Sequence, residues 1–210
     1  MSEISVPSRV LVATGNRGKL REFRYLLTPL KIELISLNEF PFVAEPEEGG
    51  STFQANAELK ASYYAIQTGE WSVADDSGLE IDLLDGRPGV LSARYGGNAM
   101  PYSEKMTLVL NEMSKAAKFR RGIERGAQFV SVIALADPSG RVCFTAEGIC
   151  RGSVVHRPRG SHGFGYDPIF APAGFDRTFG EMSDDEKSSL SHRGKASIEF
   201  IRKMSDFTGV

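Results

Sequence analysis

A glycine-containing run near the N-terminus, Thr14-Gly15-Asn16-Arg17-Gly18-Lys19, combines a predicted turn with a lysine. It lies between an apolar stretch and a segment with helical spacing, so free backbone N–H groups at the helix start and the helix dipole would favour a phosphate there. The run is not a Walker A loop, because Leu20 follows the lysine and offers no hydroxyl to a metal ion. A plain turn between a strand and a helix explains the glycines equally well.

Two acidic pairs, Glu47-Glu48 and Asp75-Asp76, are candidates for metal chemistry. Mg²⁺ takes oxygen ligands and often needs only one or two carboxylates besides substrate phosphates. We expect Asp75 and Asp76 to end a strand, at the sheet edge where ligands usually bind. Adjacent side chains of an extended backbone point to opposite faces, so one aspartate could ligate metal while its neighbour orients water. A solvated Asp-Ser-Gly turn is the simpler alternative.

Asn56 and Lys60 are four residues apart on a predicted helix and therefore share one face. That face borders the apolar stripe of the helix, so a lysine held there could reach an anionic substrate. A surface lysine that extends its ammonium into solvent is the more common case for such a pair.

Aromatic residues and hydrogen-bond donors gather in the C-terminal third. The run Phe164-Gly165-Tyr166-Asp167 precedes a predicted strand, and an aromatic face in a glycine-opened loop can stack a purine base. A packed turn with core aromatics is the alternative. Lys187, His192 and Arg193 are donors near a helix start that could contact base edges or phosphates, although a structural histidine and solvated cations are common.

The elements that must position these residues alternate between strand and helix. A strand over 10–13, a helix over 19–27 and a strand over 32–37 open the chain and favour an α/β fold. Thr52 can cap the next helix. The remaining predicted elements are strands over 72–74 and 79–84 joined by a turn at 75–78, a helix over 102–113, strands over 128–136, 142–149 and 168–171, a capping box at 183–186 and a terminal helix over 198–204.

Composition excludes several classes of protein. The 210 residues carry a net charge of −2, which provides no positive field for a nucleic-acid backbone. No stretch predicts a signal peptide or a membrane span, so we expect a cytoplasmic protein without a membrane partner. The two cysteines, Cys143 and Cys150, are predicted to be small buried hydrophobes. The basic segment Lys115 to Arg125, with Arg120 and Arg121 adjacent, is predicted to be a solvated loop.

In this order the segments resemble the Ham1-like family of inosine and xanthosine triphosphate pyrophosphatases. The similarity runs from about Val10 to Ala196 and includes Asp-Asp-Ser-Gly-Leu, Ser-Ala-Arg-Tyr, Phe-Gly-Tyr-Asp-Pro-Ile-Phe and Ser-His-Arg-Gly. The resemblance implies a single α/β domain over residues 1–210, with two lobes around a long, twisted mixed sheet flanked by helices and the active site in the cleft between lobes. It also implies a homodimer, Mg²⁺ as cofactor and a purine nucleoside triphosphate as substrate.

The resemblance also implies residue roles. Water activated by Asp76, with Asp75 as a possible helper, would attack the α-phosphorus, and pyrophosphate would leave. Glu47 and Asp76 match the metal-binding acids, and Lys60 matches a phosphate contact in the catalytic set. The substrate-binding set comprises Thr14, Gly15, Asn16, Arg17, Gly18, Lys19, Asn56, Ser77, Phe164, Gly165, Tyr166, Asp167, Lys187, His192 and Arg193.

Some features depart from the family pattern, and two other functions compete with it. His162-Gly163 stands where members often have Gly-Gly, and Gly49 where they often have a hydroxyl residue. A Maf-type pyrophosphatase with a different base preference is one rival, against which the Phe-Gly-Tyr-Asp and Ser-His-Arg motifs argue. A nucleotide-binding protein without catalysis is the other, and the full set of acidic positions argues against it.

Overall fold

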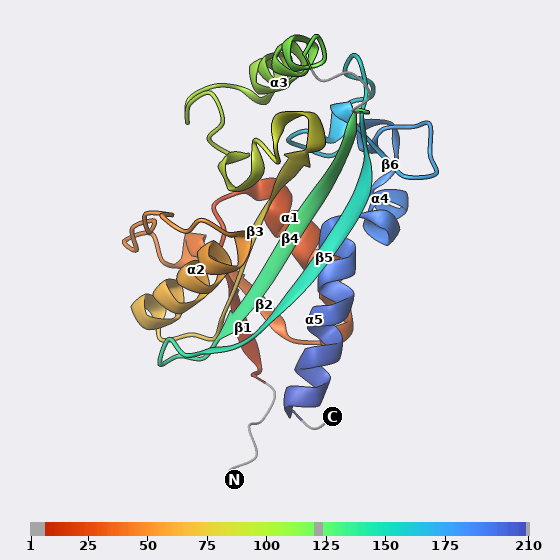
Figure 1. The fold of residues 1–210 in the computed structure, drawn as a ribbon. Helices are drawn as coiled ribbons and strands as arrows, with labels where there is room; N and C mark the ends of the chain where they lie inside the picture. Colours follow the sequence, from red (N-terminus) through yellow and green to blue (C-terminus); the bar gives the residue numbers. More distant parts are fainter. Residues whose placement is uncertain (1–6, 120–123, 209–210) are drawn as a thin grey trace. The chain divides into compact units, whose positions relative to one another are not determined.

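The computed structural model describes residues 7–119 and 124–208, so Arg120 and Arg121 lie outside the described residues. Helices and strands alternate along most of this chain (Figure 1). The helices are α1 (Arg17–Leu26), α2 (Phe53–Thr68), α3 (Tyr102–Ala116), α4 (Asp184–Leu190) and α5 (His192–Thr208). The strands are β1 (Arg9–Val12), β2 (Glu33–Ser36), β3 (Ser72–Ile81), β4 (Gly126–Ala136), β5 (Val142–Val154) and β6 (Phe170–Pro172).

The described strands form one mixed sheet in the order β2-β1-β3-β4-β5-β6. Strand β1 runs parallel to both neighbours, with Val12 opposite Ser36 of β2 and Val73 of β3, whereas β5 and β6 are antiparallel. Parallel neighbours require a crossover connection, and α1 and α2 lie in the segments that connect these strands. The prediction of a mixed α/β sheet flanked by helices is therefore confirmed.

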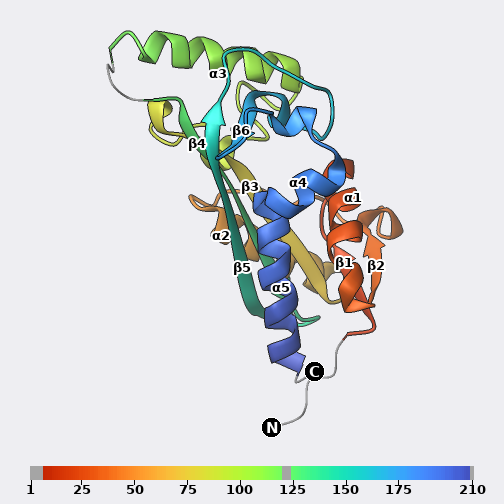
Figure 2. The same cartoon turned by 90° about the vertical axis from the view of Figure 1, so that its right-hand side faces the viewer.

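The chain divides into two compact units. The first comprises Met1–Asp76, Ser131–Gly148 and Arg193–Val210, and the second Ser77–Val130 and Ile149–His192. Each unit has its own apolar core. In the first, Phe23, Phe200 and Val73 pack together. Figure 2 labels the elements that carry them, α1, α5 and β3. In the second, Val109 of α3 packs with Leu79 and Phe129.

Several local predictions are confirmed. Thr52 caps α2, since its side chain accepts a hydrogen bond from the backbone N–H of Ala55. Ser183 and Glu186 form the capping box at the start of α4. Cys150 is buried as expected, whereas Cys143 is only half-buried. No helix of the described residues combines the length and apolarity that a membrane crossing needs.

The largest local error concerns the segment around the paired aspartates. The predicted turn at 75–78 does not exist, because β3 continues without interruption from Ser72 to Ile81. The predicted strand over 79–84 ends early, and a short 3-10 helix occupies Asp82–Leu84. Asp, Ser and Gly favour a turn locally. Here the backbone stays extended because residues from distant elements bind both buried carboxylates, as described below.

Other boundaries also differ. Strand β5 extends to Val154, helix α5 begins at His192, and a 3-10 helix precedes β6 where one strand was predicted. The basic segment is not a solvated loop throughout, since Lys115 belongs to α3 and Arg125 is half-buried. The guanidinium of Arg125 donates to the carbonyl oxygens of Val154, at 2.6 Å, and Val155, at 2.9 Å, which gives it a structural role.

Candidate active site

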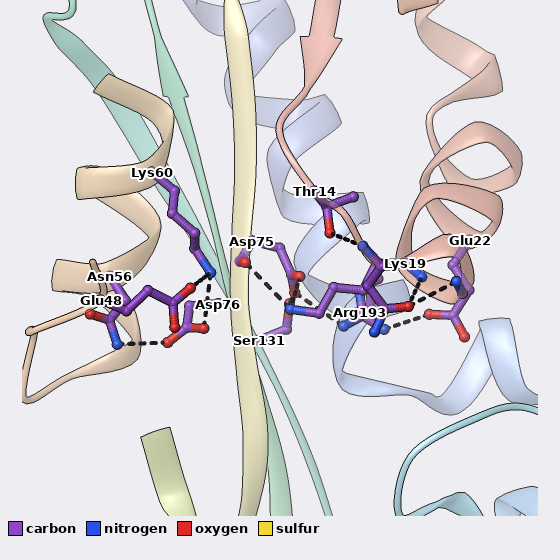
Figure 3. A network of polar contacts seen from close by, with 12 residues as sticks. Thr14, Lys19, Glu22, Glu48, Asn56, Lys60, Asp75, Asp76, Ser131 and Arg193 are labelled. Atoms are coloured by element: carbon purple, nitrogen blue, oxygen red, sulfur yellow. Dashed lines mark hydrogen bonds and ion pairs between the residues drawn. The ribbon is translucent and has the colours of Figure 1, made fainter. Parts of the chain in front are cut away.

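Strand β3 carries two neighbouring carboxylates with separate surroundings. Asp75 is 2% exposed and Asp76 is 6% exposed. Because side chains alternate along a strand, Asp75 faces α1 and α5, whereas Asp76 faces α2 (Figure 3). The prediction that these side chains point to opposite faces is confirmed, although they lie inside a strand and not at its end.

Asp75 is the centre of a buried ion-pair network. Its Oδ1 lies 2.6 Å from Lys19 Nζ, and its Oδ2 lies 3.1 Å from Arg193 Nη2. The hydroxyl of Ser131 donates to the same Oδ2 at 3.0 Å. Arg193 also pairs with Glu22 of α1, at 2.5 Å. The cations Lys19 and Arg193 thus compensate the anions Asp75 and Glu22. A buried charge is stable only when it is paired in this way.

Charge compensation keeps Asp75 ionised. Burial alone would raise the pKa of this carboxyl, but the positive charges of Arg193 and Lys19 outweigh burial and hold the pKa far below its usual range. Asp75 is therefore ionised at neutral pH, where it pairs with Lys19. A carboxylate bound in this way is a poor general base, so its position fits a structural partner of Lys19 better than the second catalytic acid suggested by the resemblance.

The glycine run adopts a turn at the start of α1, as predicted, but two of its backbone N–H groups already donate hydrogen bonds within the run. Asn16 is the N-cap: its Oδ1 accepts hydrogen bonds from Gly18 N at 2.8 Å and Lys19 N at 3.2 Å. The backbone N–H of Asn16 in turn donates to Thr14 Oγ1 at 3.2 Å. The expectation that these N–H groups are free is wrong, because an asparagine cap already binds two of them. Gly15 and Arg17 are exposed.

Asp76 is bound from α2. Its Oδ1 lies 3.1 Å from Lys60 Nζ, and its Oδ2 accepts a hydrogen bond from Asn56 Nδ2 at 3.0 Å. The predicted shared face of Asn56 and Lys60 is confirmed. The alternative of a solvated surface lysine is wrong, since Lys60 is only 7% exposed. Burial raises the pKa of Asp76, and the opposing effect of the Lys60 charge does not cancel that rise.

The acidic loop before α2 supplies a second carboxylate, and it is Glu48. Its Oε1 lies 2.7 Å from Lys60 Nζ, so one ammonium holds the carboxylates of Glu48 and Asp76. Glu47, which was predicted as the metal-binding acid, is exposed. Only Glu48 of the two adjacent acids therefore contacts Lys60, and a metal-binding role for Glu47 stays a prediction.

The second unit holds the predicted aromatic segment. Lys187 Nζ lies 2.7 Å from Asp167 Oδ2 and 4.7 Å from the ring centre of Phe164, a cation–π distance. Asp167 Oδ2 also accepts the Phe164 N–H at 2.7 Å. Tyr166 is buried, and its hydroxyl donates to the carbonyl oxygen of Ser92. The half-buried ring of Phe164 is the more accessible of the two aromatic faces, whereas Tyr166 packs in the core as the alternative interpretation expected.

The remaining candidates are distributed over both units. Ser77 is half-buried on β3, and Gly165 adopts a positive φ of 68° in the second unit. The imidazole of His192 stacks on Phe129, with ring centres 4.6 Å apart and planes at 11°. Arg193, predicted to contact the base, is 1% exposed in the first unit, where it pairs with Glu22 and Asp75.

Two residues of these networks, Glu22 and Ser131, were not predicted from the sequence, and Glu48 was predicted only as one member of an acidic pair. A signal was available for one of them, since Glu22 lies three residues after Lys19 and therefore shares its side of α1. Ser131 lies inside a long apolar strand, and nothing in its surroundings in the sequence indicates a partner.

The carboxylates of Glu48 and Asp76 fit a hard divalent cation in their chemistry. Both supply oxygen ligands, and both lie close together because each contacts the ammonium of Lys60. Two carboxylates do not form a complete coordination shell, and no group of three or more His, Cys, Asp or Glu side chains among the described residues has an arrangement that would hold a metal. A cation here would therefore need further ligands, such as substrate phosphate oxygens and water.

A mixed sheet whose inner strand carries two buried aspartates, each paired with a lysine from a flanking helix, defines an α/β protein with a charged site suited to anions and cations together. The chain belongs to the Ham1 family, which matches it over residues 10–203.

Similar proteins cover nearly the whole chain. A dITP/XTP pyrophosphatase of Nostoc sp. is 47% identical over 195 residues, which are 93% of this chain and 93% of the relative. The dITP/XTP pyrophosphatase of Gluconobacter oxydans is 44% identical over 98% of this chain and 95% of the relative. Among solved structures, a HAM1 protein from Coxiella burnetii has a TM-score of 0.84 at 38% identity, covering 94% of this chain and 98% of that one.

Proposed function

We propose that this protein hydrolyses inosine, deoxyinosine and xanthosine triphosphates to the nucleoside monophosphate and pyrophosphate. The observation that carries the proposal is the pair of carboxylate–lysine contacts on β3, Asp75 with Lys19 and Asp76 with Lys60. Lysines suit the negative charge of a triphosphate, and carboxylates suit a divalent cation and an attacking water. Membership of the Ham1 family supports the same conclusion, as does the similarity of the chain to dITP/XTP pyrophosphatases of Nostoc sp. and Gluconobacter oxydans.

In this proposal the first unit binds the triphosphate. Lys19 and the exposed Arg17 face the phosphates from α1, and Lys60 does so from α2. Glu48 and Asp76 would hold Mg²⁺, which when bound neutralises phosphate charge and lowers the pKa of a coordinated water. Asp76 accepts the proton of the attacking water at a carboxylate oxygen. Its raised pKa suits this role better than the strongly depressed pKa of Asp75.

The purine base belongs to the second unit in this proposal. The ring of Phe164 would stack on the base, and the ammonium of Lys187 would donate to the 6-oxo group of hypoxanthine or xanthine. Adenine carries an amino donor at that position, so ATP would leave the lysine facing another donor. A site built to bind an acceptor discriminates strongly against a donor in its place.

The direct test is pyrophosphate release from ITP with Mg²⁺ present and after EDTA treatment. We expect turnover with Mg²⁺, loss of turnover with EDTA and recovery when Mg²⁺ is added back, because without the cation the carboxylates of Glu48 and Asp76 would repel the phosphates. ATP and a pyrimidine triphosphate serve as comparison substrates. Binding of ITP without pyrophosphate release would support the non-catalytic rival, and a preference for the pyrimidine substrate would support the Maf-type rival.

A second prediction concerns the hold on pyrophosphate. We expect Lys19→Met to raise KM for ITP and to weaken inhibition by pyrophosphate, because a methionine keeps the length of the side chain but removes its charge. Lys118→Met is the matched control, since Lys118 is an exposed lysine beyond the end of α3. Unchanged pyrophosphate inhibition in Lys19→Met would remove α1 from the phosphate site.

Two further features remain predictions. The homodimer is measured by analytical ultracentrifugation, and the cytoplasmic location by fractionation of cells that express the tagged protein.

A further inference from the structure

Asn56 is a buried amide with a fixed orientation. Its side chain is fully buried, with both ends in hydrogen bonds. The Oδ1 atom accepts the backbone N–H of Gly50 at 2.9 Å. The Nδ2 atom donates to Asp76 Oδ2 at 3.0 Å (Figure 3). Because a backbone N–H can only donate, Gly50 determines which end of the amide is the acceptor, and the donor end must face Asp76.

Gly50 is required by proximity and not by backbone conformation. A Cβ atom at this position would lie 2.5 Å from Asn56 Oδ1 and 3.1 Å from the Cβ of Ala55. The adjacent Gly49 differs, since a Cβ there would meet nothing within 4 Å. The backbone of the acidic loop therefore approaches α2 closely at Gly50, where the hydrogen bond to Asn56 forms.

This contact links the two carboxylates of the proposed metal site. Glu48 lies two residues before Gly50 in the loop, and Asp76 lies on β3. Asn56 binds the loop through Gly50 and the strand through Asp76, while Lys60, one turn further along α2, pairs with both carboxylates. Loss of the amide would free the loop and one oxygen of Asp76 together.

We propose that Asn56 is a positioning residue that acts through Asp76 and the Glu48 loop and does not contact the nucleotide. The hydrogen bond to Oδ2 prevents rotation of the Asp76 carboxylate, and the hydrogen bond from Gly50 keeps Glu48 beside it. The inference rests on the proposed hydrolysis, and it replaces the substrate contact expected for Asn56 from the sequence.

The test separates kcat from KM. Leucine resembles asparagine in shape but forms no hydrogen bond, so we expect Asn56→Leu to lower kcat for ITP by about 10- to 100-fold, the usual effect of losing a partner that orients metal ligands. KM for ITP should change little, because the nucleotide loses no contact. The control is Gln54→Leu, which removes an exposed amide from the same helix and should leave both constants unchanged.

A double-mutant cycle tests the link to the loop even if Asn56→Leu folds poorly. Gly50→Ala should lower kcat in the wild-type background because its methyl group displaces the Asn56 amide, whereas Gly49→Ala should not. In an Asn56→Ala background the 2.5 Å conflict with the amide disappears and only the 3.1 Å approach to the Cβ of Ala55 remains, so Gly50→Ala should then have a much smaller effect.

Three results would overturn the role of Asn56 in an active enzyme: an unchanged kcat in Asn56→Leu, a raised KM with an unchanged kcat, or equal effects of Gly50→Ala in both backgrounds. Absence of ITP hydrolysis by the wild-type protein would instead overturn the proposed function itself.

Discussion

Replacing Asp76 by asparagine is expected to lower kcat for ITP by about 10²- to 10⁴-fold, the range for loss of a positioned general base. The amide keeps the shape of the side chain but loses its charge and basicity. It also cannot satisfy both neighbours well. If its oxygen faces Lys60, its NH₂ group faces the NH₂ group of Asn56, and the reverse orientation places a donor against an ammonium. Steady-state kinetics with ITP measure the effect.

The control for this prediction is Asp176→Asn, which removes an exposed carboxylate from the surface and should leave kcat unchanged. Circular dichroism should show that Asp76→Asn retains the wild-type fold, since the variant removes a buried charge from beside a lysine that still pairs with Glu48. Turnover within a few-fold of wild type would exclude Asp76 as the base, and the proposed chemistry would then need another acceptor for the proton of water.

The largest loss of stability is expected for Arg193→Met. This substitution leaves Asp75 and Glu22 without the guanidinium that pairs with both, inside a region where Arg193 is only 1% exposed. Removing one partner of a buried ion pair destabilises a protein by about 3–5 kcal/mol, and we expect the lower end of that range here because Lys19 still pairs with Asp75. Chemical denaturation at neutral pH measures the free energy of unfolding. Arg202→Met, which breaks exposed pairs on α5, should change that free energy little.

The pH dependence of the free energy of unfolding tests whether Asp75 is the source of the stability lost in Arg193→Met. The pKa of Asp75 is depressed in the folded protein, so its contribution to stability is present above the pKa of the unfolded chain and is lost as pH falls below about 4. The difference in free energy of unfolding between wild type and Arg193→Met should therefore become smaller as the pH is lowered below about 4. A loss of ITP-over-ATP selectivity without a loss of stability would contradict this view and restore Arg193 to the base contact expected from the sequence.

The features that were predicted correctly from the sequence depend on the local repeat of side-chain directions along a helix or strand. The opposite directions of Asp75 and Asp76 follow from the period of a strand, and the shared face of Asn56 and Lys60 follows from the period of a helix. The caps at Thr52 and Ser183 depend on residues three positions apart. In each case the geometry is set by a few consecutive residues, so no knowledge of distant elements was required.

The features that sequence missed depend on which distant segments meet. Asp-Asp-Ser-Gly favours a turn locally, yet β3 stays extended because lysines from α1 and α2 bind its carboxylates. Glu47 and Glu48 are the same residue type, and only the path of the loop shows that Glu48 reaches Lys60. The partners of Arg193 lie 171 and 118 residues away along the chain, a separation that no local pattern can indicate.

The alternation of side chains along β3 has a consequence for how this protein can evolve. Asp75 and Asp76 have different surroundings because adjacent side chains of a strand point to opposite faces, so that Asp75 lies beside α1 and Asp76 beside α2. An insertion or deletion of one residue in β3 ahead of them would exchange the surroundings of the two aspartates, even though both aspartates remained. Proteins descended from this chain can therefore vary the length of the turn between β4 and β5, whereas a change of one residue in β3 would turn both carboxylates to the wrong faces.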